Sequence, residues 1–179
     1  MKRLDLGCGT RKRPGYIGVD RLALPGVDVV HDLSVQPYPF GESEIDEVVM
    51  DNVLEHLDDP IAVMEEVYRI CRNGAAVTVI VPYFRSSCAF IDPTHRHFFG
   101  VDWFAYFDPS HPFCSRYGYS RARFAVERRE FDREYQTQRI GLLHRVCIRF
   151  AQKHPHFYEE RLSHLYPLHS LTFRLRVIK

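Results

Sequence analysis

The sequence predicts an α/β fold built on a doubly wound, mostly parallel β-sheet. Five short apolar runs in the first 82 residues each end at a glycine, an acid or a proline, as buried parallel strands do. A clear amphipathic helix lies between the fourth and the fifth run. Because strands that alternate with helical connections form parallel sheets, these two observations together indicate the α/β class.

The five predicted strands span residues 3–6, 16–20, 27–32, 45–51 and 75–81. The fifth predicted strand is rich in β-branched residues, which favour extended backbone. The predicted helix can be capped by Asp58 or Asp59 and has Pro60 in its first turn. Asn73 and Gly74 are expected to end it.

The second half of the chain predicts fewer regular elements. Residues 83–119 have no sustained period and contain three prolines, which predicts a long loop or an insertion of short helices. We expect a strand at 123–131 and an amphipathic helix at 138–152. The run 171–178 alternates apolar with polar residues, so we expect an antiparallel strand at an edge of a seven-stranded sheet.

The composition fits one domain over residues 1–179 and excludes several classes of protein. Hydrophobic residues make up 45% and charged residues 26% of the chain. No apolar run approaches the roughly 20 residues of a membrane span, and no signal-peptide core follows Met1. Five scattered cysteines without a C-x-x-C pair argue against disulfides and structural zinc. We therefore expect a cytoplasmic protein with no membrane partner.

Charge and aromatic residues divide the chain into unlike halves. Residues 1–100 carry 10 Lys+Arg against 15 Asp+Glu, and residues 101–179 carry 14 against 8, so the halves sit near −5 and +6. Twelve of the 24 aromatic residues fall within 83–119. They predict either an apolar lid over a substrate or ordinary core. The net charge of +1 argues against a nucleic-acid partner.

The residues that follow the first three strands indicate a nucleoside cofactor. Gly7 and Gly9 come directly after the first strand and let the backbone approach a ligand closely. The second strand ends at Asp20, where a carboxylate can accept hydrogen bonds from ribose hydroxyls, and the third ends at Asp32. The carboxyl ends of parallel strands form the ligand edge of such sheets. The alternative is that the glycines only make a turn and that Asp20 is a cap.

These segments resemble the successive motifs of class I S-adenosylmethionine-dependent methyltransferases, over residues 3–82. The motifs are LDLGCGT at 4–10, GYIGVD at 15–20, IDEVVMDNVLEHL at 45–57 and NGAAVTVIVP at 73–82. The turn KRPGYIGVD at 12–20 is similar to that of small bacterial and archaeal enzymes of the type 11-like family. The resemblance implies a Rossmann-like sheet, with 1–82 as the cofactor-binding half and 83–179 as the acceptor-side insert and C-terminal strands.

The resemblance also implies how S-adenosylmethionine would be held. Asp5 would hold the amino group of its methionine part, Asp20 its ribose, and Asp32 would face its adenine. The implied cofactor-binding set is Asp5, Gly7, Cys8, Gly9, Asp20, Arg21, Asp32, Leu33, Asp51 and Asn52. Cys8 is expected to be a small packed residue and not a nucleophile.

The first motif departs from the family pattern in two ways. Its third glycine is absent, with Arg11 nearby. Only ten residues separate Gly9 from Asp20, too few for a strand and a full crossover helix, so we expect a shortened first crossover. The open cofactor edge would then be covered by residues 11–13 or by a second copy of the chain in a homodimer.

Methyl transfer to an oxygen is helped by a base, and histidine suits neutral pH. His56 follows the fourth strand, and His95 and His97 follow the fifth. Asp92 is expected to orient His95 or His97 as a catalytic partner. The alternatives are that His56 only bonds to backbone and that residues 92–97 only anchor a loop. No metal ion is expected, since no carboxylate-rich ligand set has ordinary spacing.

The sequence therefore predicts methyl transfer to a hydroxyl or amine of a small molecule, such as a sugar or a secondary metabolite. The residues after the fourth strand, DNVL at 51–54, are not the N/D-P-P-Y/F of enzymes that methylate amino groups of nucleic acids. Two alternatives stay open. One is a protein that binds the cofactor for a role other than methyl transfer. The other is a metal-dependent hydrolase that uses Asp92, His95 and His97.

Overall fold

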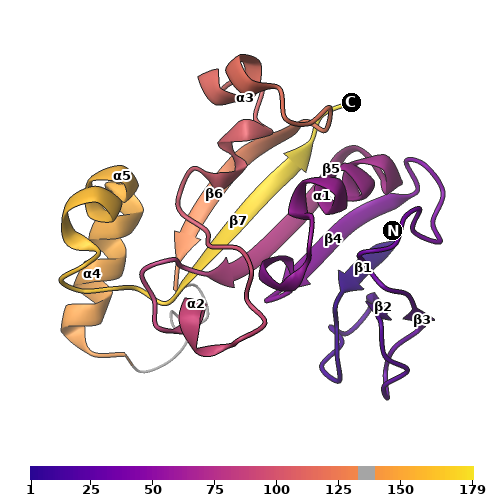
Figure 1. Ribbon diagram of the computed structural model, residues 1–179, viewed down its shortest axis with the longest axis horizontal. Coiled ribbons are helices and arrows are strands. Elements are labelled where there is room, and N and C mark those ends of the chain that lie inside the picture. The colour runs from indigo at the N-terminus through magenta and orange to yellow at the C-terminus, as the bar shows by residue number, and fades with distance from the viewer. Residues whose placement is uncertain (133–139) are drawn as a thin grey trace.

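A seven-stranded sheet in the order β3-β2-β1-β4-β5-β7-β6 forms the centre of the protein (Figure 1). The structure is a computed structural model that describes residues 1–132 and 140–179. The strands are β1 (Arg3–Leu6), β2 (Ile17–Asp20), β3 (Val29–Val30), β4 (Ile45–Asp51), β5 (Cys71–Pro82), β6 (Phe124–Phe131) and β7 (Ser170–Val177). The predicted α/β class, the mostly parallel sheet and the antiparallel C-terminal strand are confirmed.

β1 lies in the middle of the parallel half, where Leu6 pairs with Val19 of β2 and with Met50 of β4. Leu6, Val19 and Met50 are fully buried. Their apolar side chains fix the register, because a shift by one residue would turn buried side chains to the other face. The parallel register brings the carboxyl ends of β1, β2 and β4 to one edge of the sheet.

The connections after β1, β2 and β3 contain no helix within the described residues. The shortened first crossover is thus confirmed. The connections from β2 to β3 and from β3 to β4, both fully described by the structure, also lack a helix. The turn after β1 is held directly on β2, since the amides of Gly7 and Cys8 both donate to the carbonyl of Val19, at 2.8 and 3.2 Å. The cofactor edge predicted from the sequence is therefore built from turns.

Helix α1 (Pro60–Ile70) is capped as the sequence predicts, but it ends earlier. Asp59 Oδ1 accepts hydrogen bonds from the amides of Ile61 and Ala62. The predicted stop at Asn73-Gly74 is wrong, because β5 begins at Cys71, which pairs with Ile45. Gly74, at φ 77°, lies instead where the β4–β5 register shifts.

The alternation of apolar and polar residues predicted an edge strand at 171–178. This prediction is wrong, because β7 lies between β5 and β6. Its basic side chains have acidic partners on β6. Arg174 Nε donates to Glu130 Oε2 at 2.9 Å, and Arg176 Nη2 donates to Glu127 Oε2 at 3.0 Å. These cross-strand pairs allow a basic, alternating strand to occupy an interior position.

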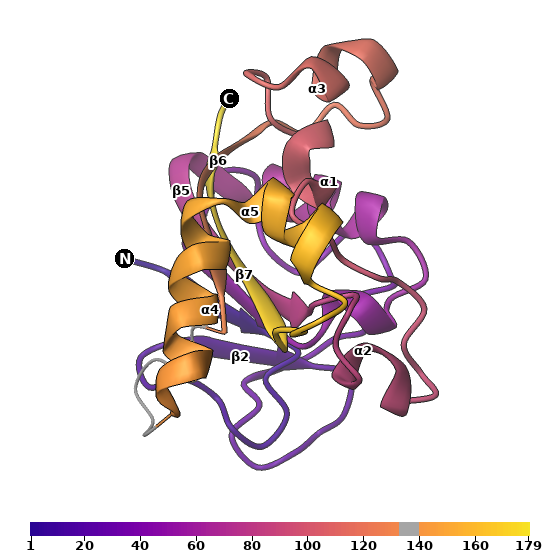
Figure 2. The same ribbon diagram turned by 90° about the vertical axis from the view of Figure 1, so that its left-hand side faces the viewer.

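The other helices are short, apart from α4. They are η1 (Leu54–His56), α2 (Cys88–Ile91), η2 (Trp103–Tyr106), α3 (Pro112–Tyr117), α4 (Leu142–Lys153), α5 (Pro155–Phe157) and η4 (Tyr158–Leu162). The helix predicted from Gln138 is described from Leu142 onward, and its first two predicted residues lie outside the described ranges. α4 and α5 flank β6, far from β1, β2 and β3, and stand at the front of the view in Figure 2. None of the described helices combines the length and the apolar character that a membrane crossing needs.

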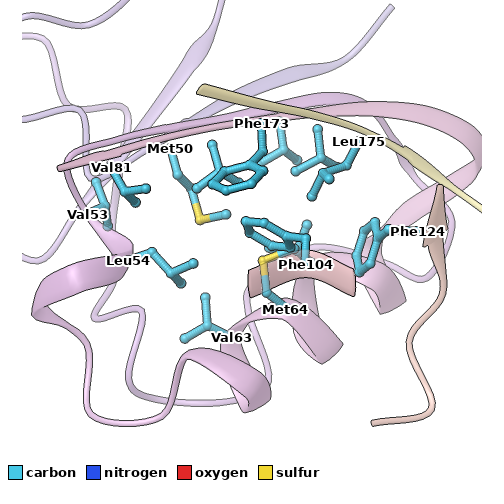
Figure 3. Packing of buried hydrophobic residues seen from close by; sticks show 14 of the residues in the cluster. Met50, Val53, Leu54, Val63, Met64, Val81, Phe104, Phe124, Phe173 and Leu175 are labelled. Carbon is cyan, nitrogen blue, oxygen red and sulfur yellow. The ribbon is translucent and has the colours of Figure 1, made fainter. Parts of the chain in front are cut away.

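The main core lies between the sheet and the segments α1, η1 and η2 (Figure 3). Phe104 of η2 is fully buried, and its ring centroid lies 4.8 Å from that of Phe173 in β7. Phe99 and Phe107 are buried as well. Much of the aromatic cluster that predicted a lid or a core is therefore core.

Replacing Phe104 by alanine tests this packing. We expect Phe104→Ala to lower the free energy of unfolding by about 3–5 kcal/mol, because a fully buried ring leaves a cavity. The matched control is Phe90→Ala, whose ring is 64% exposed and should change stability by no more than about 0.5 kcal/mol. Urea unfolding measures both, and equal losses would contradict the placement of Phe104.

Candidate functional site

A cavity of about 540 Å³ opens at the carboxyl ends of β1, β2 and β4. This size lies within the range of small-molecule sites. Its lining residues are Gly7, Asp20, Arg21, Asp32, Leu33, Ser34, Asn52, Val53, His56, Leu57, Asp58, Thr94 and Arg96. Six of the ten predicted cofactor-binding residues and one predicted base candidate, His56, thus share one cavity.

The turn after β1 fits a backbone that must come close to a ligand. Gly7 has φ 70°, and a Cβ there would lie 2.4 Å from Cγ2 of Val53, so no other residue fits without a shift. Gly9 has φ 53°, and no atom lies within 4 Å of the position that its Cβ would take. Gly7 therefore joins the β1 turn to the segment after β4, while Gly9 leaves open space beside it.

Asp20 holds the first turn and also lines the cavity. Its Oδ2 accepts from the amide of Gly9 at 2.9 Å, and its Oδ1 accepts from the amide of Leu22 at 3.0 Å. Because a carboxylate oxygen can accept more than one hydrogen bond, both oxygens keep capacity for a ligand's hydroxyls.

Asp5 and Asp51 lie outside the cavity lining and are both engaged by Arg13. Asp5 is buried and accepts from the amide of Arg13 at 2.8 Å, and burial raises the pKa of its carboxyl. Asp51 Oδ2 accepts from Arg13 Nη2 at 2.7 Å. Of the three residues expected to cover the cofactor edge, Arg13 therefore ties the turn to the ends of β1 and β4.

Cys8 and Gly9 also lie outside the lining. The Sγ of Cys8 lies 2.8 Å from where a Cβ on Gly18 would stand, so the thiol packs on the bare backbone of β2. Burial raises the pKa of the Cys8 thiol, which keeps it protonated. This geometry agrees with a packed residue and not with a nucleophile.

A chain of hydrogen bonds fixes the imidazole of His56. Thr94 Oγ1 donates to Asp92 Oδ1 at 2.7 Å and lies 2.8 Å from His56 Nδ1. A hydroxyl has only one proton to donate, so Thr94 accepts from His56 Nδ1–H. The other ring nitrogen, Nε2, then carries a free lone pair. Burial and the neighbouring His95 lower the pKa of His56, which favours this neutral form.

Glu55 is a buried carboxyl beside this chain that sequence reasoning missed. It is 1% exposed, and neither oxygen has a hydrogen-bond partner among the described residues. Burial raises the pKa of Glu55 to about 7. The sequence pattern singled out His56, the next residue, as a candidate base. It gave no sign that Glu55 in the same short helix η1 is buried.

His95 faces Glu55. Its Nδ1 lies 3.0 Å from the carbonyl of Ala89, which can only accept, so Nδ1 carries the proton and Nε2 is directed to Glu55 Oε1 at 4.0 Å. Potential ligand atoms of Glu55, His56 and His95 lie within 4.8 Å of one another. Such a cluster can share a proton or hold a divalent cation.

Asp92 makes its side-chain hydrogen bonds to Thr94, and so supports His56 in place of the predicted His95 or His97. His97 does not line the cavity. Its backbone amide and that of Arg96 donate to the carbonyl of Glu55, at 3.3 and 2.8 Å. The loop-anchor alternative thus describes His97, since these bonds hold the loop against η1.

Other lining residues also escaped the sequence reasoning. Arg96 forms an ion pair with Asp58 at the cavity, and Thr94 links His56 to Asp92. Trp103 and Tyr106, considered for a lid, line a separate pocket of about 200 Å³. Phe98 is exposed and stacks on Phe90, with ring centroids 4.8 Å apart.

Comparison with known proteins agrees with this geometry. Residues 4–79 match the family model of a methyltransferase domain. No curated protein matches the sequence. A methyltransferase solved in complex with the Haloferax volcanii Trm112 methyltransferase activator has 14% identity and a TM-score of 0.59, over 99% of this chain and 83% of that one.

Two further structures share the fold. A SAM-dependent methyltransferase from Archaeoglobus fulgidus has 19% identity and a TM-score of 0.54, over 98% of this chain and 86% of that one. The [4+2]-cyclase SpnF has 14% identity and a TM-score of 0.58, over 99% and 75%. Proteins that share this fold thus carry out more than one reaction. Residues 4–79 thus resemble a methyltransferase domain, and the chain as a whole shares its fold with solved methyltransferases.

Proposed function

We propose that this enzyme methylates a hydroxyl or amine of a small molecule, such as a sugar or a secondary metabolite, with His56 as the general base. The observation that carries this proposal is the Asp92–Thr94–His56 chain, which leaves Nε2 of a cavity-lining imidazole unprotonated. A base in this form can take a proton from an acceptor at neutral pH.

The residues of the cavity fit the cofactor. When bound, S-adenosylmethionine supplies a methyl group on a positively charged sulfur, which a lone pair can attack. The bare backbone at Gly7 and Gly9 allows close approach, and Asp20 is placed to accept from ribose hydroxyls. Asp32 and Leu33 would face the adenine.

Asn52 and Arg13 complete the proposed cofactor side. Asn52 and Gly7 both line the cavity. The backbone of Asn52 has φ 54°, a conformation that asparagine tolerates better than most residues. In this proposal Asp5 and Asp51 act by holding Arg13, which positions the glycine turn. Arg21 lines the ribose end next to Asp20.

The proton that the acceptor loses would pass to His56 Nε2. The resulting imidazolium would be stabilised by the carboxylate of Asp92. The hydroxyl of Thr94 lies between the two groups, orients the ring and is hydrogen-bonded to both. Hydrogen bonds from Thr94 hold the pKa of Asp92 low, so its carboxylate stays ionised.

The proposal divides one domain into two functions. Residues 1–82 hold the cofactor, and residues 83–179 supply the acceptor side, from which Thr94 and Arg96 reach the same cavity. We place the protein in the cytoplasm, where its five free cysteines suit a reducing environment. A second copy of the chain is the partner that we propose for the helix-free edge.

A divalent cation is the second candidate for the cluster of Glu55, His56 and His95. The carboxylate of Glu55, which has no hydrogen-bond partner in residues 1–132 or 140–179, favours it. This cluster differs from the predicted hydrolase set of Asp92, His95 and His97. If methyl transfer stops on dialysis against a chelator and returns with Mg²⁺ or Zn²⁺, the metal is required; unchanged activity favours the proton-transfer chain.

Asp20→Asn should weaken binding of S-adenosylhomocysteine by about 10- to 100-fold, because a charged acceptor for two hydroxyls is lost. Isothermal calorimetry measures the affinity, and near-ultraviolet circular dichroism checks the fold. Glu42→Gln, an exposed acid outside the cavity, is the control and should bind normally. Full affinity in Asp20→Asn would refute the assigned ribose site.

Thr94→Val should release the imidazole of His56 without affecting cofactor affinity. In the parent protein, nitrogen NMR should show a neutral ring protonated at Nδ1; in Thr94→Val this preference should be lost, while Thr94→Ser keeps it. With an acceptor found by labelled-methyl transfer into a metabolite panel, His56→Gln should lower kcat by about 10²- to 10⁴-fold. A ring that stays protonated at Nε2 in the parent would contradict the proposed base.

Glu55→Gln should change how stability depends on pH. The pKa of Glu55 rises from 4.5 to about 7 on folding. Between these pH values the Glu55 carboxyl is ionised in the unfolded chain but protonated in the folded protein. Stability attributable to the neutral carboxyl is complete below pH 4.5 and is lost as pH rises toward 7. The stability of Glu55→Gln relative to the parent should therefore increase by about 3 kcal/mol across this window. Urea unfolding at several pH values measures it; a constant difference would show that the carboxyl is not buried alone.

A further inference from the structure

An apolar stripe runs along the outer side of α4 and continues onto α5. Leu143, Val146 and Phe150 recur at intervals of three and four residues and are 64%, 54% and 37% exposed. Phe157 of α5 is 54% exposed, and its ring centroid lies 6.1 Å from that of Phe150. Leu142, 79% exposed, completes what we call the α4 stripe.

The inner side of α4 fixes the direction of this stripe. Ile148 and Ala151 are buried, and Gln152 Oε1 accepts from the amide of Phe131 in β6 at 3.1 Å. His144 Nε2 lies 3.1 Å from Asp132 Oδ2. Because these contacts hold one face of the helix on the sheet edge, the α4 stripe points outward. The position of α4 at the front of the view in Figure 2 agrees with this direction.

A row of positive charge lies beside the α4 stripe. Arg145, Arg149 and Lys153 recur every four residues, and all three are exposed. None of them makes an ion pair with an acid in residues 1–132 or 140–179. The sequence from 140 to 158 contains no Asp or Glu. The outer side of α4 is thus both apolar and basic.

This combination favours an anionic lipid surface over the other possible occupants. An interfacial helix has leucine and aromatic side chains on one face and Lys or Arg along its flank. An antiparallel two-fold contact between the α4 helices of two copies would bring two such basic rows together, which like-charge repulsion opposes. No such repulsion arises at a surface of anionic phospholipid headgroups.

We propose that α4 docks the enzyme on anionic membrane surfaces. The α4 stripe would lie at the boundary of headgroups and acyl chains, with Arg145, Arg149 and Lys153 against the lipid phosphates. This departs from the expectation of no membrane partner, which rested on the absence of a spanning segment. The proposal is independent of the acceptor and of the base, since α4 does not line the cavity.

Vesicle co-sedimentation of the full chain tests the proposal. Binding should be strong to vesicles of phosphatidylglycerol mixed with phosphatidylcholine, weak to phosphatidylcholine alone, and reduced by salt. Replacing Arg145, Arg149 and Lys153 by glutamine together should weaken partitioning on the order of 100-fold. Val146→Ser with Phe150→Ser should weaken it by at least about 10-fold.

The control replaces three exposed arginines outside α4 and the strand β6 that it flanks, namely Arg72, Arg116 and Arg121, by glutamine. It removes the same charge and should leave partitioning within about threefold of the parent. Normal affinity for S-adenosylhomocysteine shows that each variant is folded.

Three outcomes would overturn the proposal. They are no binding to the anionic vesicles, equal binding to both kinds of vesicle, and an equal loss in the control variant. A dimer in sedimentation velocity that Val146→Ser with Phe150→Ser dissociates, without loss of vesicle binding, would instead assign the α4 stripe to contact between copies.

Discussion

The close contact between Gly7 and Val53 constrains the rest of the site. A side chain on Gly7 would overlap Val53, so the turn after β1 and the segment after β4 meet only where a residue without a Cβ stands. This contact places the bare backbone of the first turn beside Asn52 and directly before η1, which carries His56. The cofactor side and the proposed base are thus positioned by one packing constraint between two parallel strands.

The acceptor side depends on a second constraint, the anchoring of the loop after β5. The carbonyl of Glu55 accepts from the amides of Arg96 and His97, which brings Thr94 to His56. The same turn buries the carboxyl of Glu55 without a partner among the described residues, at a cost to stability near neutral pH. Polar groups held this way are frequent at functional sites, where a shifted pKa serves the chemistry.

Local patterns predicted the parts of the fold that local sequence determines. Apolar runs located the strands, and the residues at their ends located the cavity, because a parallel sheet gathers those ends at one edge. The interior position of β7 could not be predicted, since it depends on Glu127 and Glu130 of another strand. Likewise, nothing near Thr94 in the sequence shows that its hydroxyl joins Asp92 to His56, and the burial of Glu55 follows from how η1 packs.

We propose that the cavity at the ends of β1, β2 and β4 holds the cofactor and that His56 is directed at the site of transfer. A crystal structure with S-adenosylhomocysteine would locate both. We expect ribose hydroxyls on Asp20, the sulfur near Gly7 and Asn52, and Nε2 of His56 facing the open space beyond the sulfur. Cofactor density elsewhere, or a His56 ring bonded to Thr94 through Nε2, would contradict it.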